Sequence, residues 1–377
     1  MDRILIKNGT AYDPLTKETG VRDIALSEGR IVSVSGFDPT FVADASGCLV
    51  IPGLIDFHVH CLPSAADIGI DPDLFCLPNG VTSCVDAGSA GVSGFESAFR
   101  YTICRSVVTV KTLLHFCSAG QITSAYPEDQ TPRLWDRNAI KETVNKYRDS
   151  IVGMKLRFSD NVLEPFKLGI EVLEEGINLA HELELPLVLH VNNPGMDIDA
   201  IAGLLRPGDV FCHAYAGSRE NILDSKGNLR KSVAAARDKG VIFDAASGRR
   251  NFLFDIAAKA IKQGFLPDII STDMNWNCFN KQPVISFPRL LSRYLALGLG
   301  LYDVIDRATV NPARWLGCPK SVSLAEGSAA DIAVFKILDK EMEFADSAGF
   351  TVKGKQILSP RLTIKAGRVM YAQSDFC

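Results

Sequence analysis

The sequence lacks an excess of charge of either sign, which argues against a polyanionic or membrane partner. Its 377 residues include 40 Lys and Arg against 44 Asp and Glu, a formal net charge of −4. It has no run of the roughly 18 uncharged apolar residues that a membrane helix needs, and its start, MDRILIKNGTAYDP, has no basic stretch followed by an apolar one. We therefore expect a cytoplasmic protein that binds neither nucleic acid nor membrane.

Cysteine pairs with CxxC spacing are also absent. The ten cysteines are scattered, which fits reduced and mostly buried thiols better than a disulfide framework or a zinc ribbon. Histidine is scarce, with six copies, but four of them lie at the ends of hydrophobic strand-like runs: His58 and His60 in VIPGLIDFHVH, His190 and His213. Imidazole is a common ligand of zinc-like ions, so this placement is the most informative feature of the chain.

The middle of the chain alternates short apolar runs with amphipathic helical segments. The expected strands are 54–60, 81–88, 111–117, 152–158, 186–192, 209–215, 241–246 and 269–274. The expected helices between them include 95–107, 138–150, 167–183, 232–240 and 253–264. Eight strands alternating with helices predict an α/β fold, a (β/α)8 TIM barrel around a parallel sheet.

The two ends of the chain share a sequence pattern that differs from that of the middle. Residues 1–50 contain short strands with NG, EG and SG turns, and a similar pattern returns in LAEGSAADIAVFKI and RLTIKAGRVMYAQ within residues 318–377. We expect these two parts to form one small discontinuous β domain, and residues 51–317 to form the barrel.

Six residues of metal-ligand or basic type lie at the ends of these strands. In a TIM barrel the carboxyl ends of the strands build the active site. The six residues are His58, His60, Lys155, His190, His213 and Asp273. Each alone has an ordinary interpretation, as a core histidine or a helix cap, but the six together predict a metal site. Lys155 is the exception, because a buried ammonium must be neutralised or paired.

These residues and their surroundings resemble the amidohydrolase superfamily. The resemblance rests on PGLIDFHVH after a β segment, the lysine of the fourth strand, the histidines of the fifth and sixth, STD in the eighth, and the later motifs TVNPARWLG and GSAADIAVF. It covers nearly the whole chain.

The resemblance implies a two-metal centre. In such members, carbon dioxide converts the lysine of the fourth strand to a carbamate that bridges two divalent ions, usually zinc. Carried over, His58, His60 and Asp273 would hold the first ion, His190 and His213 the second, and the Lys155 carbamate both. A metal-bridging hydroxide would be the nucleophile, and Asp273 the general acid and base.

Within the superfamily, GVTSCVDAGSAG, GMKLRF, LHVNNPG and FCHAYAG are most similar to the dihydroorotase-like and deacetylase group. Dihydroorotases carry an arginine shortly after HxH, whereas Cys61, Leu62, Pro63 and Ser64 follow His60 here, which argues against that activity. Deaminases of the adenosine type place a glutamate where this chain has Ala216, which argues against deamination.

Several polar residues near the predicted ligands are candidates for substrate binding: Arg157, Asn192, Tyr215, Arg249, His115 and Asn275. Strand alternation places the first three on the same face as a ligand two residues earlier. Arg157 would bind a carboxylate or form a salt bridge at the rim, Asn192 and Tyr215 would contact substrate or orient ligands, Arg249 would bind an anion or be solvated, and His115 would contact substrate or be structural.

The sequence thus predicts an amidohydrolase that cleaves the amide or ester bond of a small, carboxylate-bearing substrate. The candidates are an N-acyl amino acid, an acetylated hydroxy acid or a cyclic amide, and the alternatives are a dihydroorotase or hydantoinase type of enzyme and a non-catalytic dihydropyrimidinase-like scaffold. The substrate is the expected partner, and homo-oligomerisation stays open.

Overall fold

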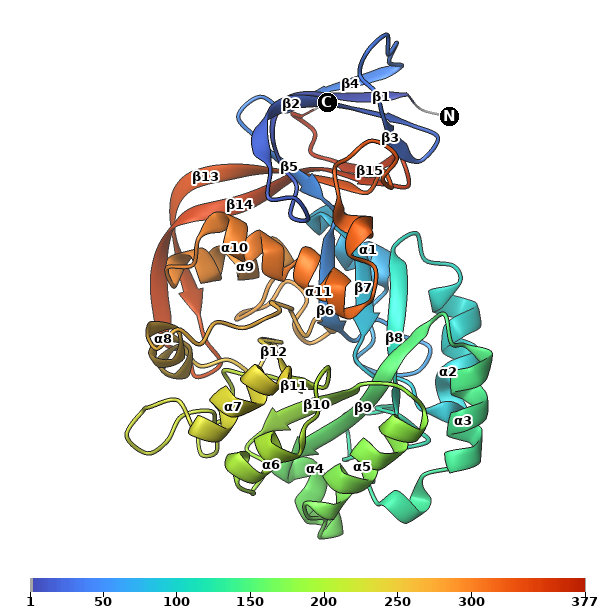
Figure 1. Cartoon of the computed structure of the whole chain (residues 1–377), viewed down its shortest axis with the longest axis vertical. Helices are drawn as coiled ribbons and strands as arrows, with labels where there is room; N and C mark the ends of the chain where they lie inside the picture. Colours follow the sequence, from blue (N-terminus) through green and yellow to red (C-terminus); the bar gives the residue numbers. More distant parts are fainter. Residues whose placement is uncertain (1–2, 377) are drawn as a thin grey trace.

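The computed structural model describes residues 3–376 and contains a curled parallel sheet and a separate, mostly antiparallel β domain (Figure 1). The parallel sheet keeps its strands in chain order. Its strands are β6 (Leu54–Val59), β7 (Val81–Asp86), β8 (Thr109–His115), β9 (Ile151–Ser159), β10 (Leu187–Asn192), β11 (Val210–Cys212) and β12 (Ile242–Asp244). Helices surround the sheet on its outside, so the predicted barrel architecture is confirmed.

All five predicted helices are present, and four of them are shorter than expected. The helices are α1 (Pro72–Cys76), α2 (Val92–Ala98), α3 (Arg137–Lys146), α4 (Asp160–Leu163), α5 (Glu171–Glu182), α6 (Ile198–Leu204), α7 (Lys231–Lys239), α8 (Phe254–Lys262), α9 (Phe287–Ala296), α10 (Leu301–Arg307) and α11 (Val310–Trp315). In α5 the buried residues Val172, Leu173, Gly176, Leu179 and Ala180 recur every three or four positions, so one face packs on the sheet.

The eighth strand candidate, residues 269–274, is irregular. It closes the barrel only through isolated bridges, Asp244 to Ile269 on one side and Val59 to Met274 on the other. Asp273 has φ 52° inside this segment, a left-handed conformation that no regular strand allows. The backbone of the segment still bonds to β6, because Asp273 N donates to His58 O at 2.7 Å.

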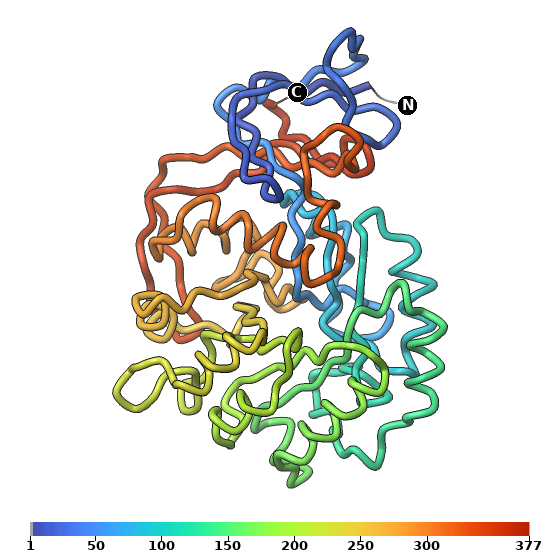
Figure 2. Tube along the Cα trace, in the orientation of Figure 1, coloured from blue at the N-terminus to red at the C-terminus, as the bar shows by residue number. Residues whose placement is uncertain are grey.

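The β domain combines strands from both ends of the chain, as predicted. Its order is β15-β14-β13-β5-β1-β2-β3, with β4 beside β1. The strands are β1 (Ile4–Tyr12), β2 (Thr19–Ser27), β3 (Arg30–Val32), β4 (Phe41–Asp44), β5 (Leu49–Pro52), β13 (Ile332–Ala345), β14 (Thr351–Lys365) and β15 (Arg368–Ala372). Figure 2 shows the chain returning at its end to the part where it began. Because β5 runs across residues 50 and 51, we propose that the first domain boundary follows this strand.

The long hairpin of β13 and β14 connects the β domain with the barrel domain through packing contacts. It extends from the small sheet along the barrel flank (Figure 1), where β14 packs on α9. The Leu358 amide donates to Ser292 Oγ on α9 at 2.9 Å, and both residues are buried. The hairpin therefore holds α9 in place.

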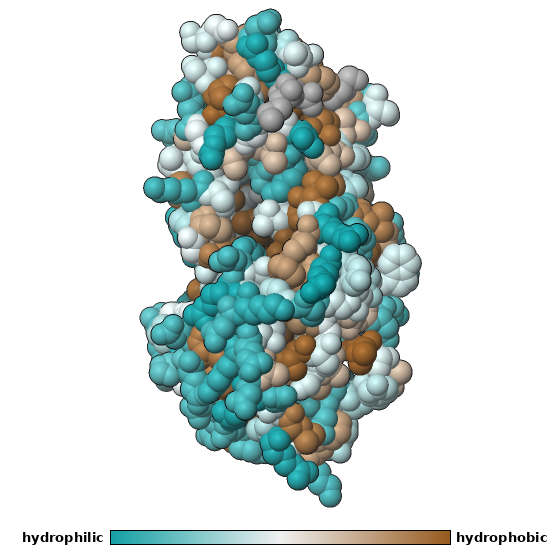
Figure 3. Space-filling model, turned by 90° about the vertical axis from the view of Figure 1, so that its right-hand side faces the viewer, coloured by the Kyte–Doolittle hydropathy of each residue, from teal (hydrophilic) through white to brown (hydrophobic). Residues whose placement is uncertain are grey.

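The surface over α2, α3 and α5 is largely hydrophilic in the lower half of Figure 3. Charged side chains pair there, for example Arg137 with Glu175 at 2.6 Å and Lys141 with Glu182 at 3.1 Å. Within residues 3–376 no helix is long and apolar enough to cross a membrane.

Candidate metal centre and active-site pocket

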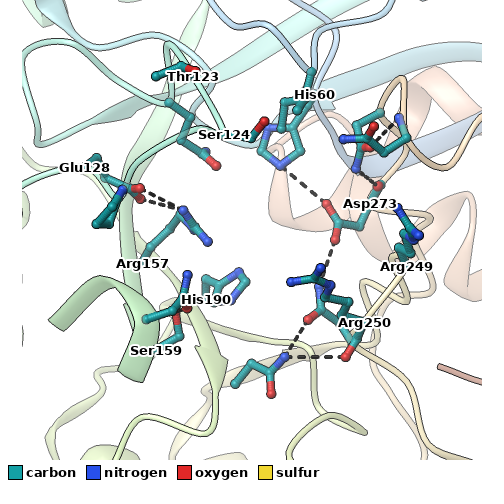
Figure 4. A pocket seen from close by; sticks show the side chains of 18 of the residues that line it. His60, Thr123, Ser124, Glu128, Arg157, Ser159, His190, Arg249, Arg250 and Asp273 are labelled. Atoms are coloured by element: carbon teal, nitrogen blue, oxygen red, sulfur yellow. Dashed lines mark hydrogen bonds and ion pairs between the residues drawn. The ribbon is translucent and has the colours of Figure 1, made fainter. Parts of the chain in front are cut away.

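A pocket of about 760 Å³ opens at the carboxyl ends of the parallel strands. His60, Lys155, His190 and Asp273 line its bottom, and loops from several βα units form its walls (Figure 4). His58 and His213 do not line it but lie buried directly beside these groups. The position agrees with the usual place of a TIM-barrel active site.

The two histidines at the end of β6 turn their Nε2 atoms toward Asp273. Asp273 Oδ1 lies 3.3 Å from His60 Nε2 and 3.9 Å from His58 Nε2. On its other side His58 Nε2 lies 3.3 Å from Lys155 Nζ. The HxH pair thus aims both rings at one point, as the spacing predicts.

The histidines after β10 and β11 form the other half of the cluster. His213 Nε2 lies 2.8 Å from His190 Nδ1, and the His213 ring centroid is 5.1 Å from that of His58. His213 has φ 65°, because the chain leaves the regular strand at Cys212. The structure therefore brings all six predicted residues together in one continuous cluster.

In His213 and His60, a hydrogen bond on the far side of the ring fixes which nitrogen faces the cluster. His213 Nδ1 lies 2.6 Å from the carbonyl oxygen of Ala246, and a carbonyl only accepts, so this nitrogen carries the proton. His60 Nδ1 lies 3.0 Å from Ser89 Oγ, which donates to Asp86 Oδ2 at 2.7 Å. His213 Nε2 therefore keeps a free lone pair, as metal binding requires.

His58 has no such hydrogen bond on its Nδ1. This atom lies 3.3 Å from Asp244 Oδ2, yet both atoms are buried without a hydrogen bond of good geometry. Burial raises the pKa of Asp244 to about 6, although the hydrogen bond from Ser271 and the charge of His213 act to lower it. Asp244 and Cys212 also form a second group of potential ligands with His58, on its Nδ1 side.

Lys155 is buried in the middle of the cluster with only 1% of its surface exposed. No carboxylate from residues 3–376 lies within ion-pair distance of its Nζ, and burial lowers the pKa of this amine. The stem of the side chain packs against Gly88, where a Cβ would come within 2.5 Å of Lys155 Cβ. Position 88 must therefore be glycine for the lysine to fit.

Asp273 is held between the cluster and the loop after β12. Its Oδ2 accepts a hydrogen bond of 2.9 Å from Asn251 Nδ2, and a Cβ on Gly248 would lie 2.2 Å from the same oxygen. Burial raises the pKa of Asp273, but the hydrogen bond to His60 and the charges of His58 and His213 outweigh burial and lower it overall. The carboxylate is thus ionised and oriented.

The donor set fits divalent cations of the zinc type. Ligand atoms of His58, His60 and Asp273 lie within 4.8 Å of one another, and imidazole nitrogen with carboxylate oxygen is a common zinc set. The second pair of rings supplies two more nitrogens, and an unpaired buried lysine lies between both groups. These residues offer enough ligand atoms for a divalent metal centre.

Of the predicted substrate contacts, four line the pocket: Arg157, Asn192, Arg249 and Asn275. The Asn192 amide is already used, because its Nδ2 donates to Asn251 Oδ1 at 2.8 Å. Asn275 likewise donates to the Asp273 carbonyl at 3.0 Å. Arg157 Nη1 bonds to both carboxylate oxygens of Glu128 at 2.8 Å. The side-chain amides of Asn192 and Asn275 therefore form part of the pocket wall, and their donors are already used by protein acceptors.

Two of the candidate contacts do not line the pocket, and for His115 the structural alternative fits the burial. Tyr215 is fully buried away from the pocket and donates its hydroxyl to Phe265 O at 2.9 Å. The alternation argument fails there because β11 ends at Cys212 and the next residue, His213, has a positive φ. His115 is also fully buried, with Nε2 3.6 Å behind Glu128 Oε1, so it does not line the pocket.

Sequence reasoning missed Glu128 and Asn251. Glu128 is almost fully buried, and although burial raises its pKa, Arg157 and His115 lower it to about 2. Both residues lie in irregular loops, where hydrophobic periodicity carries no signal. The only local sign for Asn251 was the nearby glycine in SGRRN.

Comparison with known proteins finds a consistent set of relatives. A family model described as a deacetylase-like composite domain matches residues 324–371. Deacetylase Atu3266 of Agrobacterium fabrum is 30% identical over 322 residues, covering 85% of this chain and 78% of the relative. A deacetylase of Enterococcus faecalis is 28% identical over 379 residues, covering 97% of this chain and 98% of the relative.

Two solved structures match the whole chain. A crystal structure of an adenine deaminase has a TM-score of 0.90 at 27% identity and covers 99% of this chain and 100% of its own. A crystal structure of a dihydroorotase has a TM-score of 0.89 at 27% identity and covers 99% and 98%. Enzymes with these names hydrolyse carbon–nitrogen bonds. The chain therefore belongs to the amidohydrolase superfamily, in its deacetylase-like group, and is a metal-dependent hydrolase of carbon–nitrogen bonds.

Proposed function

We propose that this protein is a deacylase that removes an acyl group, such as acetyl, from a small carboxylic acid. The substrate would be an N-acyl amino acid or an acetylated hydroxy acid. The observation that carries the proposal is the convergence of six ligand-type side chains at the bottom of a pocket that also presents Arg157. Two relatives named deacetylase support the same direction.

Two divalent ions, with zinc as the expected metal, would be held by this cluster. His58, His60 and Asp273 would hold one ion, His190 and His213 the other, and a carbamate on Lys155 both. Bound there, the ions would lower the pKa of a water molecule and polarise the acyl carbonyl. Burial lowers the pKa of the Lys155 amine, and the neutral amine is the form that reacts with carbon dioxide.

Asp273 is the proposed proton carrier. One of its oxygens faces the histidines, while Oδ2 accepts the hydrogen bond from Asn251. Held this way, the carboxylate would accept the proton of the attacking water and deliver it to the leaving amine or alkoxide. Asn251 restricts rotation of the carboxylate, which keeps the accepting oxygen aimed at the pocket.

Arg157 is the proposed partner of the substrate carboxylate. Glu128 binds only its Nη1, and no acceptor from residues 3–376 bonds to Nη2. Guanidinium groups bind carboxylates with paired hydrogen bonds, and a guanidinium already fixed in place loses less conformational entropy on binding. The Arg157 and Glu128 pair would thus orient the acid end of the substrate.

The test combines metal analysis with a substrate screen. Protein purified without chelator should contain about two divalent ions per chain by mass spectrometry, and Lys155→Ala should lose metal and activity together. Lys141→Ala, on the exposed face of α3, is the matched control. The screen compares N-acetyl amino acids, acetylated hydroxy acids and cyclic amides. A metal-free wild type would exclude the metal centre and leave the scaffold class, and turnover of cyclic amides alone would identify a hydantoinase type of enzyme.

A further inference from the structure

The acidic groups of the pocket are all engaged by other protein groups. Glu128 is bound by Arg157, and Asp160 forms an ion pair with Arg219. The third acid, Asp273, belongs to the proposed metal centre. The pocket therefore has no spare negative charge to neutralise further cations.

Apart from Lys155 of the proposed metal centre, two basic side chains of the pocket have no such partner among residues 3–376. Arg249 and Arg250 line the pocket, and neither guanidinium forms an ion pair or a side-chain hydrogen bond with any residue from 3 to 376. Neighbouring like charges repel, and this repulsion is relieved when an anion binds between them or beside each. The pocket therefore has an excess of positive charge on this loop.

The loop that carries the two arginines is anchored at both ends. The Gly248 amide donates to Thr272 O at 2.9 Å, and Asn251 binds Asp273. The backbone carbonyl of Arg250 also lies 3.4 Å from Asn192 Nδ2. The two exposed side chains are thus presented from a fixed backbone, so a ligand that binds them does not also have to order the loop.

The arginines lie on the wall opposite the Glu128 and Arg157 pair, with Asp273 and His60 between the two walls (Figure 4). A ligand bound at the proposed metal centre would therefore lie between the two walls. Its first carboxylate would meet Arg157, and a second anionic group would meet the loop.

We propose that the substrate is an acylated dicarboxylic acid, such as an N-acyl acidic amino acid, whose second carboxylate is bound by Arg249 and Arg250. This inference rests on the proposed deacylase function and names its substrate class. In the reaction water adds across the acyl C–N bond, which breaks to give the acyl carboxylate and the free amine of the dicarboxylic acid. The two arginines bind the substrate and take no part in proton transfer.

The test compares N-acetylglutamate with N-acetylglutamine, in both enantiomers, because the two differ in one charge and little in shape. We expect kcat/KM of the metal-loaded wild type to be at least about tenfold higher for the glutamate derivative. The double variant Arg249→Gln/Arg250→Gln should lose this preference, mainly through KM. Raising the ionic strength from roughly 0.05 to 0.5 M should weaken the preference in the wild type.

Arg22→Gln, an exposed arginine of β2 in the β domain, is the matched control and should keep the preference. Thermal unfolding of each variant confirms that the fold is intact. Equal kcat/KM for both derivatives in the wild type, or an unchanged preference in the double variant, would overturn the inference while leaving the deacylase function in place.

A binding measurement separates the two proposals. Calorimetry compares glutarate with its monoamide on wild-type and double-variant protein, and we expect tighter binding of glutarate only when both arginines are present. If no acylated compound is hydrolysed but this pattern holds, the deacylase reaction is wrong and the dianion site stands. If neither ligand distinguishes the two proteins, the dianion site is wrong.

Discussion

The floor and the rim of the pocket are built in different ways. The floor consists of the lining side chains of His60, Lys155, His190 and Asp273, and of His58 and His213 directly beside them. The rim consists of loop residues 121–128 and 248–251. The floor groups contact one another and all but the half-buried His190 are buried, whereas on the rim Glu128 is paired and the exposed Arg249 and Arg250 have no side-chain partner among residues 3–376. The difference indicates that strand ends determine the reaction and loops determine the substrate.

Replacing a floor residue should therefore cost the most. We expect Asp273→Asn to lower kcat by about 10³- to 10⁴-fold, because the amide removes the proposed proton carrier. Steady-state kinetics on metal-loaded protein checks this, with metal content measured in parallel. Retention of more than a tenth of wild-type kcat would mean that the proton moves through another group.

The pair of buried Glu128 and half-buried Arg157 allows the rim to be tested by measuring the stability of the protein. Folding lowers the pKa of Glu128 from 4.5 to about 2, so its stabilising effect is complete above pH 4.5 and is lost as the pH falls toward 2. At pH 6 the free energy of unfolding of Glu128→Gln should be lower than that of the wild type by up to about 3 kcal/mol.

Urea unfolding of both proteins at pH 6 and pH 3 measures this difference. It should shrink at pH 3, because the wild type then loses the same contribution. Other carboxylates titrate equally in the two proteins, so they cancel. A difference that grew on acidification would contradict the sign of this shift.

Asn251 connects the two regions, and its loss should have an intermediate effect. Asn251→Ala frees Asp273 Oδ2 from its hydrogen bond, and groups that orient metal-site residues contribute about 10- to 100-fold. We expect kcat to fall more than KM rises, and Asn251→Gln to recover part of the loss. An effect on KM alone would place Asn251 among the substrate contacts instead.

The smallest effect is expected at Tyr215, which belongs to neither region. Its hydroxyl bonds to Phe265 O inside the core, so Tyr215→Phe should cost about 1 kcal/mol of stability and leave KM unchanged. Chemical denaturation and kinetics together test this. A raised KM would restore the tyrosine as a substrate contact.

The sequence predicts the floor well because strand ends carry two regular signals. Apolar runs mark the strands, and ligand-type residues such as His58 and Lys155 stand out against them. The five helices follow from the same periodicity. The sixth and eighth strands depart from it, because His213 and Asp273 take left-handed conformations that the pattern does not encode.

The rim could not be predicted in the same way. Glu128 reaches Arg157 from a loop of β8, and Asn251 reaches Asp273 across 22 positions of the chain. Such contacts depend on loop conformation and not on periodicity. The position of Tyr215 was predicted wrongly for a related reason. Strand alternation was applied beyond Cys212, the last residue of β11.

The anchored loop after β12 offers a way to engineer the substrate selectivity of this enzyme. Gly248 is fixed by the space around Asp273, and Asn251 by its bond to that residue, but nothing in the described chain restrains the side chains at 249 and 250. We therefore expect these two positions to tolerate substitution without a change in the loop backbone. A small library at these two codons would redirect selectivity toward neutral or cationic acyl compounds without rebuilding the chemistry below.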